Sequence, residues 1–223
     1  MMGEFFAQYG ALLAESTLET LYMTLGSTLM AYVLGLPMGV LLTITKKGSV
    51  AEAPRFHAAF SWLINILRSL PFMILMLFII PFTRMLVGTS IGATAALVPL
   101  TVSAAPYIAR MVEQSLEEID AGVIEAALCM GATRRQIVTR VLLVESVPSL
   151  LRGMSISLIT ILGYTAITGS VGAGGLGNIA FRFGYQFYRK DVMYATILII
   201  ILLVCIIQGI FDFISHRADK RNR

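Results

Sequence analysis

Apolar residues in this chain form long, nearly uninterrupted stretches that are separated by short polar segments. A helix needs about 20 mostly apolar residues to cross the hydrocarbon core of a bilayer. Five stretches meet this requirement, at about residues 20–43, 58–81, 88–110, 145–168 and 192–213. No segment between them is long enough for a separate soluble domain. The pattern therefore predicts an all-α integral membrane protein whose residues 1–223 form a single transmembrane domain, with membrane lipid around five transmembrane helices.

The composition excludes the two soluble alternatives. Hydrophobic residues make up 57% of the 223 residues, and charged residues make up only 13%. Soluble globular domains carry about 25% charged residues, because their surface must be solvated. Disordered chains are polar and rich in charge, so the same composition excludes them as well.

Basic residues are distributed unevenly between the two sides of the five spans, and cytoplasmic loops of membrane proteins carry an excess of Lys and Arg. Of the 17 basic residues, four lie on one side and the rest on the other. The four are Arg84, Arg182, Arg189 and Lys190, and the larger group is Lys46, Lys47, Arg55, Arg68, Arg110, Arg134, Arg135, Arg140, Arg152, Arg217, Lys220, Arg221 and Arg223. The N-terminus is therefore predicted outside, and the C-terminus and segment 111–144 are predicted in the cytoplasm. Residues 1–18 contain no Lys or Arg and do not resemble a signal peptide, so we expect the first span to remain in the mature protein.

Glycines and prolines in the spans predict local packing features. Gly35–Gly39 and Gly88–Gly92 both have the GxxxG spacing, which lets helices approach closely in a membrane. Pro71 and Pro99 fall inside predicted spans, where a proline kinks a helix.

The sequence offers no ligand set for a metal or a prosthetic group. Cys129 and Cys205 lie far apart, as do His57 and His216, so neither a disulfide framework nor a zinc or haem site can be built from them. We interpret all four as core or interface residues and predict no cofactor. Arg110, Glu145 and Asp212 lie at or next to span ends, whereas an ion-coupled carrier usually places an ionisable residue near mid-membrane. If this protein moves a solute, its energy is expected to come from another subunit.

Two patterns match motifs of soluble proteins in a context that does not suit them. Gly172–Gly177 matches GxGxxG, but the dinucleotide fingerprint requires a strand before it and a helix after it. These glycines follow a span on the predicted outer side, and we expect a tight, mobile turn there. Segment 120–137 resembles a helix-turn-helix, yet its second helix would run into the bilayer and cannot enter a DNA groove. The chain also lacks the GxxxxGK[ST] motif, so we predict neither nucleic acid as a partner nor ATP binding through a P-loop.

The cytoplasmic segment carries signals for a short helix. Asp120 can form the N-cap, Gly131 can end the helix, and Thr133–Gln136 has the form of a capping box for the next one. Between these caps, an apolar face recurs at helical spacing, formed by Val123, Ile124, Ala127 and Leu128. Such a face either packs on the chain's own spans or docks into a groove on a partner.

The same segment resembles a known family. Glu125-Ala126-Ala127, followed by three residues and Gly131, resembles the EAA motif of ABC-importer permeases, with Val144 at a position where proline is usual. Further blocks at 65–72, 88–92, 98–101, 105–113 and 171–177 are similar to the methionine-uptake permeases of bacterial inner membranes. The resemblance covers nearly the whole chain.

This resemblance implies a homodimeric permease, not itself an enzyme, that works by alternating access in the bacterial inner membrane. Its partners would be a second copy of this chain, two copies of a cytosolic ABC ATPase and a substrate-binding lipoprotein that delivers methionine or close analogues. Residues Glu125, Ala126, Ala127 and Gly131 would belong to the helix that couples permease to ATPase.

The solute pathway is less well marked. Five helices leave little room inside one bundle, so a dimer interface is the natural route. An apolar gate suited to a thioether side chain could be formed in the fourth span by Ile159, Leu162, Tyr164 and Ile167. These residues could equally be ordinary helix–helix packing residues. Three other functions remain open: an ABC permease for another small amino acid or nutrient, a secondary carrier or channel that works without ATP, and a membrane-anchored regulator.

Overall fold

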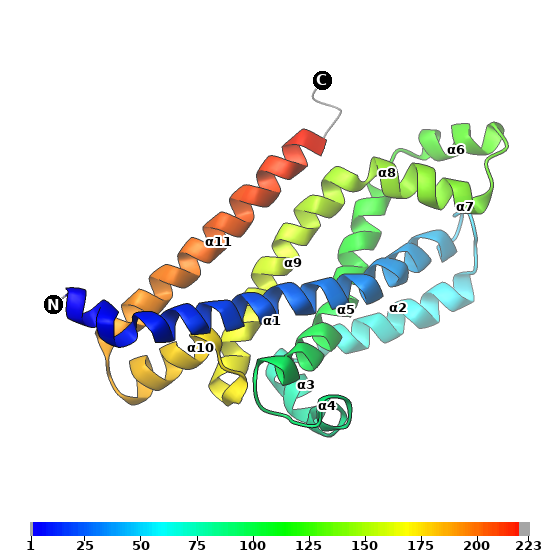
Figure 1. Cartoon of the computed structure of the whole chain (residues 1–223). Helices are drawn as coiled ribbons and strands as arrows, with labels where there is room; N and C mark the ends of the chain where they lie inside the picture. The colour runs from blue at the N-terminus through cyan, green and yellow to red at the C-terminus, as the bar shows by residue number, and fades with distance from the viewer. Residues whose placement is uncertain (1, 219–223) are drawn as a thin grey trace. The chain divides into compact units, whose positions relative to one another are not determined.

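The computed structural model describes residues 2–218, and in this part of the chain every regular element is a helix (Figure 1). The long helices are α1 (Met2–Thr45), α2 (Pro54–Ser69), α5 (Ala93–Glu117), α9 (Val147–Thr168) and α11 (Lys190–Ala218). Shorter elements connect them: α3 (Phe72–Phe78), α4 (Ile80–Val87), α6 (Ala121–Cys129), α7 (Arg134–Gln136), η1 (Ile137–Leu142), α8 (Leu143–Glu145), η2 (Gly169–Ala173), α10 (Gly175–Ile179) and η3 (Ala180–Gln186). The elements labelled η are wide π-helical turns. The all-α prediction is confirmed for the described residues.

Four segments are long and apolar enough to cross a membrane: Ala7–Thr45, Ala93–Glu117, Val147–Ala173 and Lys190–Ala218. A fifth candidate is the pair α2 and α3, which is bent by 96°. The bend falls at Leu70–Pro71, where Leu70 adopts an extended conformation. Proline disfavours the helical conformation of the residue before it, so the predicted kink in this span is a sharp break. Pro99, by contrast, lies inside the continuous helix α5.

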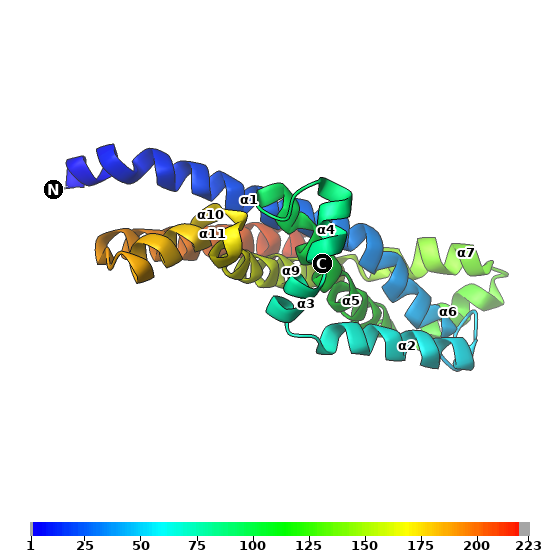
Figure 2. The same ribbon diagram turned by 90° about the horizontal axis from the view of Figure 1, so that it is seen from below.

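The described chain forms two compact units, each of which draws on several helices. The first unit comprises residues up to 30, 71–103 and 158–208, and the second comprises residues 31–70, 104–157 and 209 onward. Helices α1, α5, α9 and α11 each contribute residues to both units. Figure 2 shows these helices from below, coloured by residue number.

In the first unit, the N-terminal half of α1 packs against α10 and α11. Its core contains Tyr9 and Leu13 from α1, Leu176 and Ile179 from α10, and Val192 from α11. The ring of Tyr9 also meets the ring of Phe183 edge-on, at 5.8 Å between centroids. Apolar contact therefore holds the start of the chain to its last third.

In the second unit, α1 and α5 approach closely at Gly35 and Gly39. A Cβ atom built on Gly39 would lie 2.5 Å from the backbone oxygen of Ala109, and one on Gly35 would lie 2.8 Å from that of Ala105. Only a glycine fits at either point, so the prediction of helix packing is confirmed for this GxxxG pair.

The second GxxxG prediction is wrong. Gly88 and Gly92 lie in the connection between α4 and α5, with φ of +82° and +98°, and no heavy atom lies within 4 Å of a Cβ built on either. Both glycines are needed for left-handed backbone in a turn, because other residues rarely adopt that conformation. The backbone N–H of Gly92 donates to the carbonyl oxygen of Gly172 at 3.0 Å.

The histidines and cysteines play different structural roles. His57 of α2 lies at the contact with α1, where its Nδ1 is 3.0 Å from the carbonyl oxygen of Leu42, whereas His216 is exposed near the end of α11. Cys129 and Cys205 are both free and exposed, so neither is a core residue of this chain. Cys205 lies on α11, which has the highest mean hydropathy of the four continuous candidate spans.

Candidate functional site

The short helix α6 begins and ends as the sequence predicts. The side chain of Asp120 accepts a hydrogen bond from the Gly122 N–H at 2.7 Å and so satisfies one of the free donors of the first turn. At the other end, Gly131 has a φ of +78°. The N–H groups of Gly131 and Ala132 donate to the carbonyl oxygens of Leu128 and Ala127, at 2.9 and 3.0 Å. This pair of bonds is a Schellman motif, and its left-handed residue is the glycine.

A capping box redirects the chain after this turn. The Thr133 N–H donates to Oε1 of Gln136 at 2.8 Å, and the Gln136 N–H donates to Oγ1 of Thr133 at 3.4 Å. The chain then continues through η1 and α8 into α9. Val144, at the usual proline position of the resembled motif, is an exposed residue of α8.

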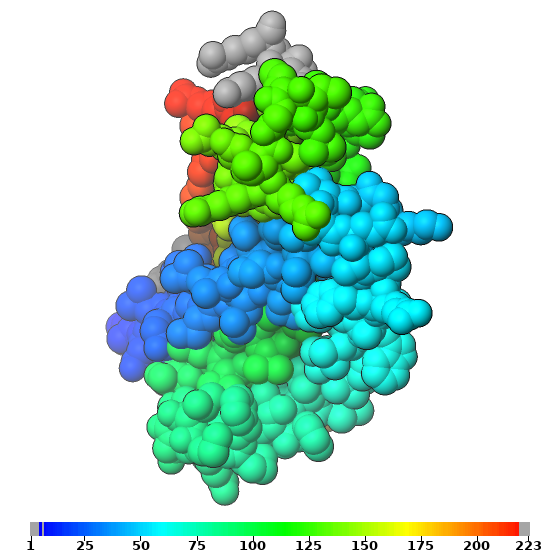
Figure 3. Space-filling model, turned by 90° about the vertical axis from the view of Figure 1, so that its right-hand side faces the viewer, coloured from blue at the N-terminus to red at the C-terminus, as the bar shows by residue number. Residues whose placement is uncertain are grey.

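The four residues assigned to coupling lie on different sides of this segment. Ala127 is buried, whereas Glu125, Ala126 and Gly131 are exposed. The surface of the segment that contains α6 and α7 is coloured green in Figure 3.

One part of the apolar face of α6 packs on the chain itself, and the other part is exposed and free to dock on a partner. Ala127 faces the interior of the second unit, while Val123 and Leu128 are 43% and 49% exposed. Met130, which the sequence reasoning missed, is 81% exposed beside them. Its spacing of seven residues from Val123 is the signal that would have found it. The helix is thus anchored by one side and leaves an apolar strip uncovered.

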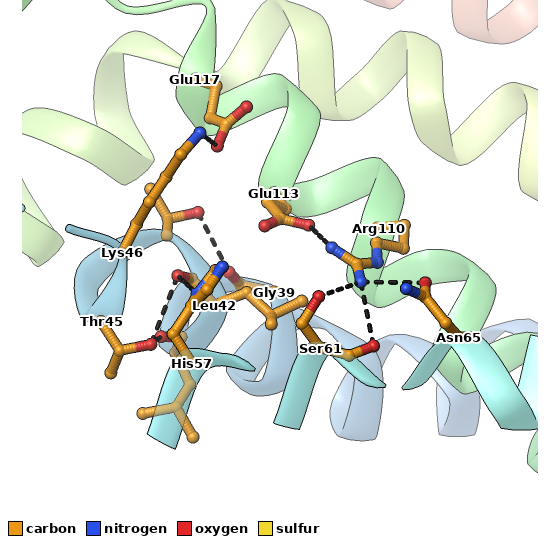
Figure 4. A network of polar contacts seen from close by, with 12 residues as sticks. Gly39, Leu42, Thr45, Lys46, His57, Ser61, Asn65, Arg110, Glu113 and Glu117 are labelled. Carbon is orange, nitrogen blue, oxygen red and sulfur yellow. Dashed lines mark hydrogen bonds and ion pairs between the residues drawn. The ribbon is translucent and has the colours of Figure 1, made fainter. Parts of the chain in front are cut away.

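A groove of about 590 Å³ runs beside α6 within the second unit. Its apolar lining includes Ile124 and Leu128 of α6, and its charged lining includes Lys46, Glu117 and Glu125. The Nζ of Lys46 is 2.5 Å from Oε1 of Glu117 (Figure 4). Because both side chains are well exposed, this ion pair contributes little to stability.

Arg110 ties α2 to α5 (Figure 4). Its Nη1 is 2.6 Å from Oε2 of Glu113, one turn further along α5. Its Nη2 donates to the backbone oxygen and Oγ of Ser61, at 3.1 and 2.5 Å, and to Oδ1 of Asn65 at 2.9 Å. The side chains of Arg110 and Glu113 are only 17% and 9% exposed, so the guanidinium cross-links two helices in a mostly buried place. The sequence placed Arg110 near a span end but gave no indication of its partners.

The four predicted gate residues do not share one surface of α9. Leu162 is buried, and the ring of Tyr164 stacks on that of Phe72 with 4.5 Å between centroids and 7° between planes. Ile159 is half-buried, and Ile167 is 37% exposed. Of the four, Ile167 is the side chain that the described surface presents most fully.

The glycine segment after α9 is hydrogen-bonded to α1. The N–H of Gly175 donates to Oε2 of Glu19 at 2.6 Å, and the N–H of Leu176 donates to Oγ1 of Thr20 at 2.9 Å. Gly174 and Gly175 have φ of +87° and +76°, and a Cβ on Gly174 would lie 2.5 Å from the Glu19 carboxylate. Successive backbone N–H groups of this turn therefore point at α1, one at the Glu19 carboxylate and the next at the Thr20 hydroxyl.

Residues 31–220 match the family model described as the binding-protein-dependent transport system inner membrane component. The probable D-methionine transport system permease protein MetI of Vibrio cholerae is 44% identical over 220 residues, which cover 99% of this chain and 98% of that relative. The methionine import system permease protein MetP of Bacillus subtilis is 46% identical over 207 residues, which cover 93% of each chain.

Solved structures show the same likeness. A chain of the MetNI methionine ABC transporter, described in inward-facing conformations, superposes with a TM-score of 0.94 and 47% identity over 96% of this chain and 99% of that one. A chain of an amino acid ABC transporter crystallised with histidines superposes with a TM-score of 0.77 at 19% identity, over 95% of this chain and 96% of that one. The second likeness concerns the fold alone.

Proposed function

Since this chain belongs to the family of binding-protein-dependent transport system inner membrane components, we propose that it is the permease subunit of an ATP-driven importer of methionine and close analogues. The observation that carries this proposal is the similarity to permeases named for methionine transport over more than nine-tenths of the chain. An ABC permease for another small amino acid or nutrient is the alternative that the fold alone would allow.

The proposed topology has five spans in one transmembrane domain, with the N-terminus outside and the C-terminus in the cytoplasm of a bacterial inner membrane. The excess of basic residues on one side supports it, although residues 219–223, three of them basic, lie outside the described residues. The two units support it as well. The first joins the N-terminal part of α1 to the connections at 88–92 and 169–177, all assigned to the outer side. The second joins the end of α1, the end of α5 and α6, all assigned to the cytoplasmic side.

The proposed assembly is a dimer of this chain with two copies of an ABC ATPase and a substrate-binding lipoprotein at the outer face. Helix α6 is the part that docks on the ATPase. Its exposed strip of Val123, Leu128 and Met130 is the surface to be covered, and Glu125 lies next to it as a charged contact. Ala126 and Ala127 are small enough for close approach on the outer and inner sides of the helix, and Gly131 makes the turn back to the membrane.

Alternating access then requires that movement of α6 reaches the spans. Only residues 118–120 separate α5 from α6, and Arg110 joins α5 to α2. A displacement of α6 by the ATPase is therefore transmitted to α5 and α2 together. Hydrolysis of ATP belongs to the partner in this scheme. Ile159, Leu162, Tyr164 and Ile167 remain the proposed gate, with Ile167 the most accessible of them.

The test is methionine uptake into proteoliposomes that contain this chain, its ATPase and its binding protein. We expect accumulation that requires ATP and that excess unlabelled methionine abolishes. Uptake that ignores ATP but follows an ion gradient would make the chain a secondary carrier. If the ATPase binds but no methionine is taken up, the chain would still be an importer permease, but methionine would not be its substrate.

A further inference from the structure

The first unit contains a groove of about 370 Å³ between the N-terminal half of α1 and the segment α10–η3, which lie side by side (Figures 1 and 2). One wall is a stripe of α1 at helical spacing, formed by Leu12, Glu15, Ser16 and Glu19, and the other is a stripe with Asn178, Ile179, Arg182 and Phe183. The hydrogen-bonded glycine segment also contributes to the lining. Small-molecule pockets span about 300–1,000 Å³, so the groove suits a ligand the size of one amino acid.

Two charges in this groove are left without a partner. The carboxylate of Glu19 already accepts the Gly175 N–H. By contrast, no ion pair or side-chain hydrogen bond within the described residues engages the carboxylate of Glu15 or the guanidinium of Arg182, which only flanks the Phe183 ring at 5.7 Å. The groove therefore offers two carboxylates on the α1 wall, of which Glu19 is hydrogen-bonded, and one guanidinium on the other wall, and the side chains of Glu15 and Arg182 are both exposed.

The rest of the lining is apolar or uncharged. Leu12, Ile179 and Phe183 provide an apolar surface between the charged groups, and Asn178 donates its side-chain N–H to the backbone oxygen of Gly169 at 3.2 Å. A ligand that satisfies all of these features has an ammonium group for Glu15, a carboxylate for Arg182 and an uncharged, apolar side chain. A free α-amino acid with an apolar side chain has this chemistry.

We infer that this groove is an outer subsite of the permease, where a zwitterionic amino acid with an apolar side chain binds through Glu15 and Arg182. The inference rests on the proposed function and deepens it, since methionine is such an amino acid. In the proposed topology the groove opens on the outer side, where a binding protein releases the solute. The subsite holds the solute before the spans open to it.

The experiment measures equilibrium binding of radiolabelled methionine to the permease–ATPase complex in nanodiscs without the binding protein. Binding to the ATPase alone is measured in parallel and subtracted. We expect saturable binding to the wild type, and we expect Arg182→Gln and Glu15→Gln each to weaken it about tenfold or more, the usual effect of losing a hydrogen bond to a charged group.

The matched control is Arg189→Gln. Arg189 carries the same charge as Arg182 but lies outside the groove lining, and its Nη2 is 2.9 Å from Oδ2 of Asp191. This hydrogen bond also raises the pKa of the Arg189 guanidinium above its ordinary value, so the residue is a cation whose charge already has a partner. Arg189→Gln is therefore expected to bind methionine like the wild type, and a loss equal to that of Arg182→Gln would overturn the assignment of Arg182.

Two methionine analogues separate ligand contact from a general structural effect. Methioninol lacks the carboxylate and 4-(methylthio)butanoate lacks the ammonium group. The wild type should bind methionine more tightly than either analogue. Arg182→Gln should bind methionine and methioninol equally but still prefer methionine to the butanoate. Glu15→Gln should bind methionine and the butanoate equally but still prefer methionine to methioninol. Wild-type affinity and analogue preference in both variants, or a wild type without saturable binding, would overturn the subsite. ATP-independent uptake by a wild-type complex that still shows this binding pattern would overturn the proposed function and leave the subsite standing.

Discussion

Gly39→Ala is the substitution whose effect the structure defines most sharply. The added Cβ would lie 2.5 Å from the backbone oxygen of Ala109 and 2.6 Å from Cβ of Val112. Ordinary contact begins at 3.4 Å, so α1 and α5 would have to separate by about 0.9 Å at this point. Because one of the atoms is backbone, a change of side-chain rotamer cannot relieve the clash.

The expected cost follows from two opposing effects. Overpacking of a well-packed interior costs about 1–3 kcal/mol, and replacing glycine by alanine inside a helix returns about 0.5–1 kcal/mol. The difference between these ranges is about 0–2.5 kcal/mol, and we expect the upper part of it, about 1–2.5 kcal/mol, because the clash involves backbone. Such a loss lowers the unfolding midpoint of a chain of this size by about 2–10 °C.

The assay is thermal unfolding of the purified protein in detergent, followed by the loss of the monodisperse species. Gly10→Ala is the matched control, because Gly10 lies in the same helix and no heavy atom is within 4 Å of its added Cβ. We expect the control to melt at or above the wild-type temperature. If Gly39→Ala melted together with Gly10→Ala, the close approach of α1 and α5 would not be the reason for this glycine.

Three further predictions concern the coupling segment, the helix clamp and the glycine turn. Gly131→Ala should reduce ATPase co-purification several-fold, because an alanine is strained at a φ of +78°. Gly131→Asn should retain more ATPase, because asparagine tolerates that conformation. Equal yields from the two variants would show that the turn at Gly131 is not needed for docking. Arg110→Gln should lower transport per ATP hydrolysed while the complex still assembles, and an unchanged ratio would show that α2 and α5 need no clamp. Glu19→Ala, which removes the acceptor, should speed hydrogen exchange at the Gly175 amide about tenfold or more, and wild-type protection would mean that the Glu19 side chain does not hold the turn.

Local features of the fold were predictable because their causes lie within a few residues. Asp120, Gly131 and the Thr133–Gln136 box cap their helices through bonds that span no more than five positions. The break at Pro71 is likewise a local steric effect, although its size of 96° was not predictable, since neighbouring packing decides how far a broken helix turns.

Features that depend on distant partners were not predictable. The two GxxxG sequences look alike, yet one packs α1 on α5 and the other forms a turn. The glycine segment at 172–177 has the composition of a tight turn, but its hydrogen bond to Glu19 joins residues 156 positions apart. No periodicity or spacing in a single sequence reports which helix face will meet that carboxylate.

The amino-acid sequence by itself therefore determined the membrane class, the helix caps and the uneven distribution of basic residues. Each of these follows from composition or from interactions between near neighbours in the chain. Only the tertiary structure decided which glycines are contacts, how Arg110 joins two helices, and that Glu15 and Arg182 face a common groove. The physical reason is that these features depend on pairs of residues brought together by packing, and packing partners are chosen by the whole fold.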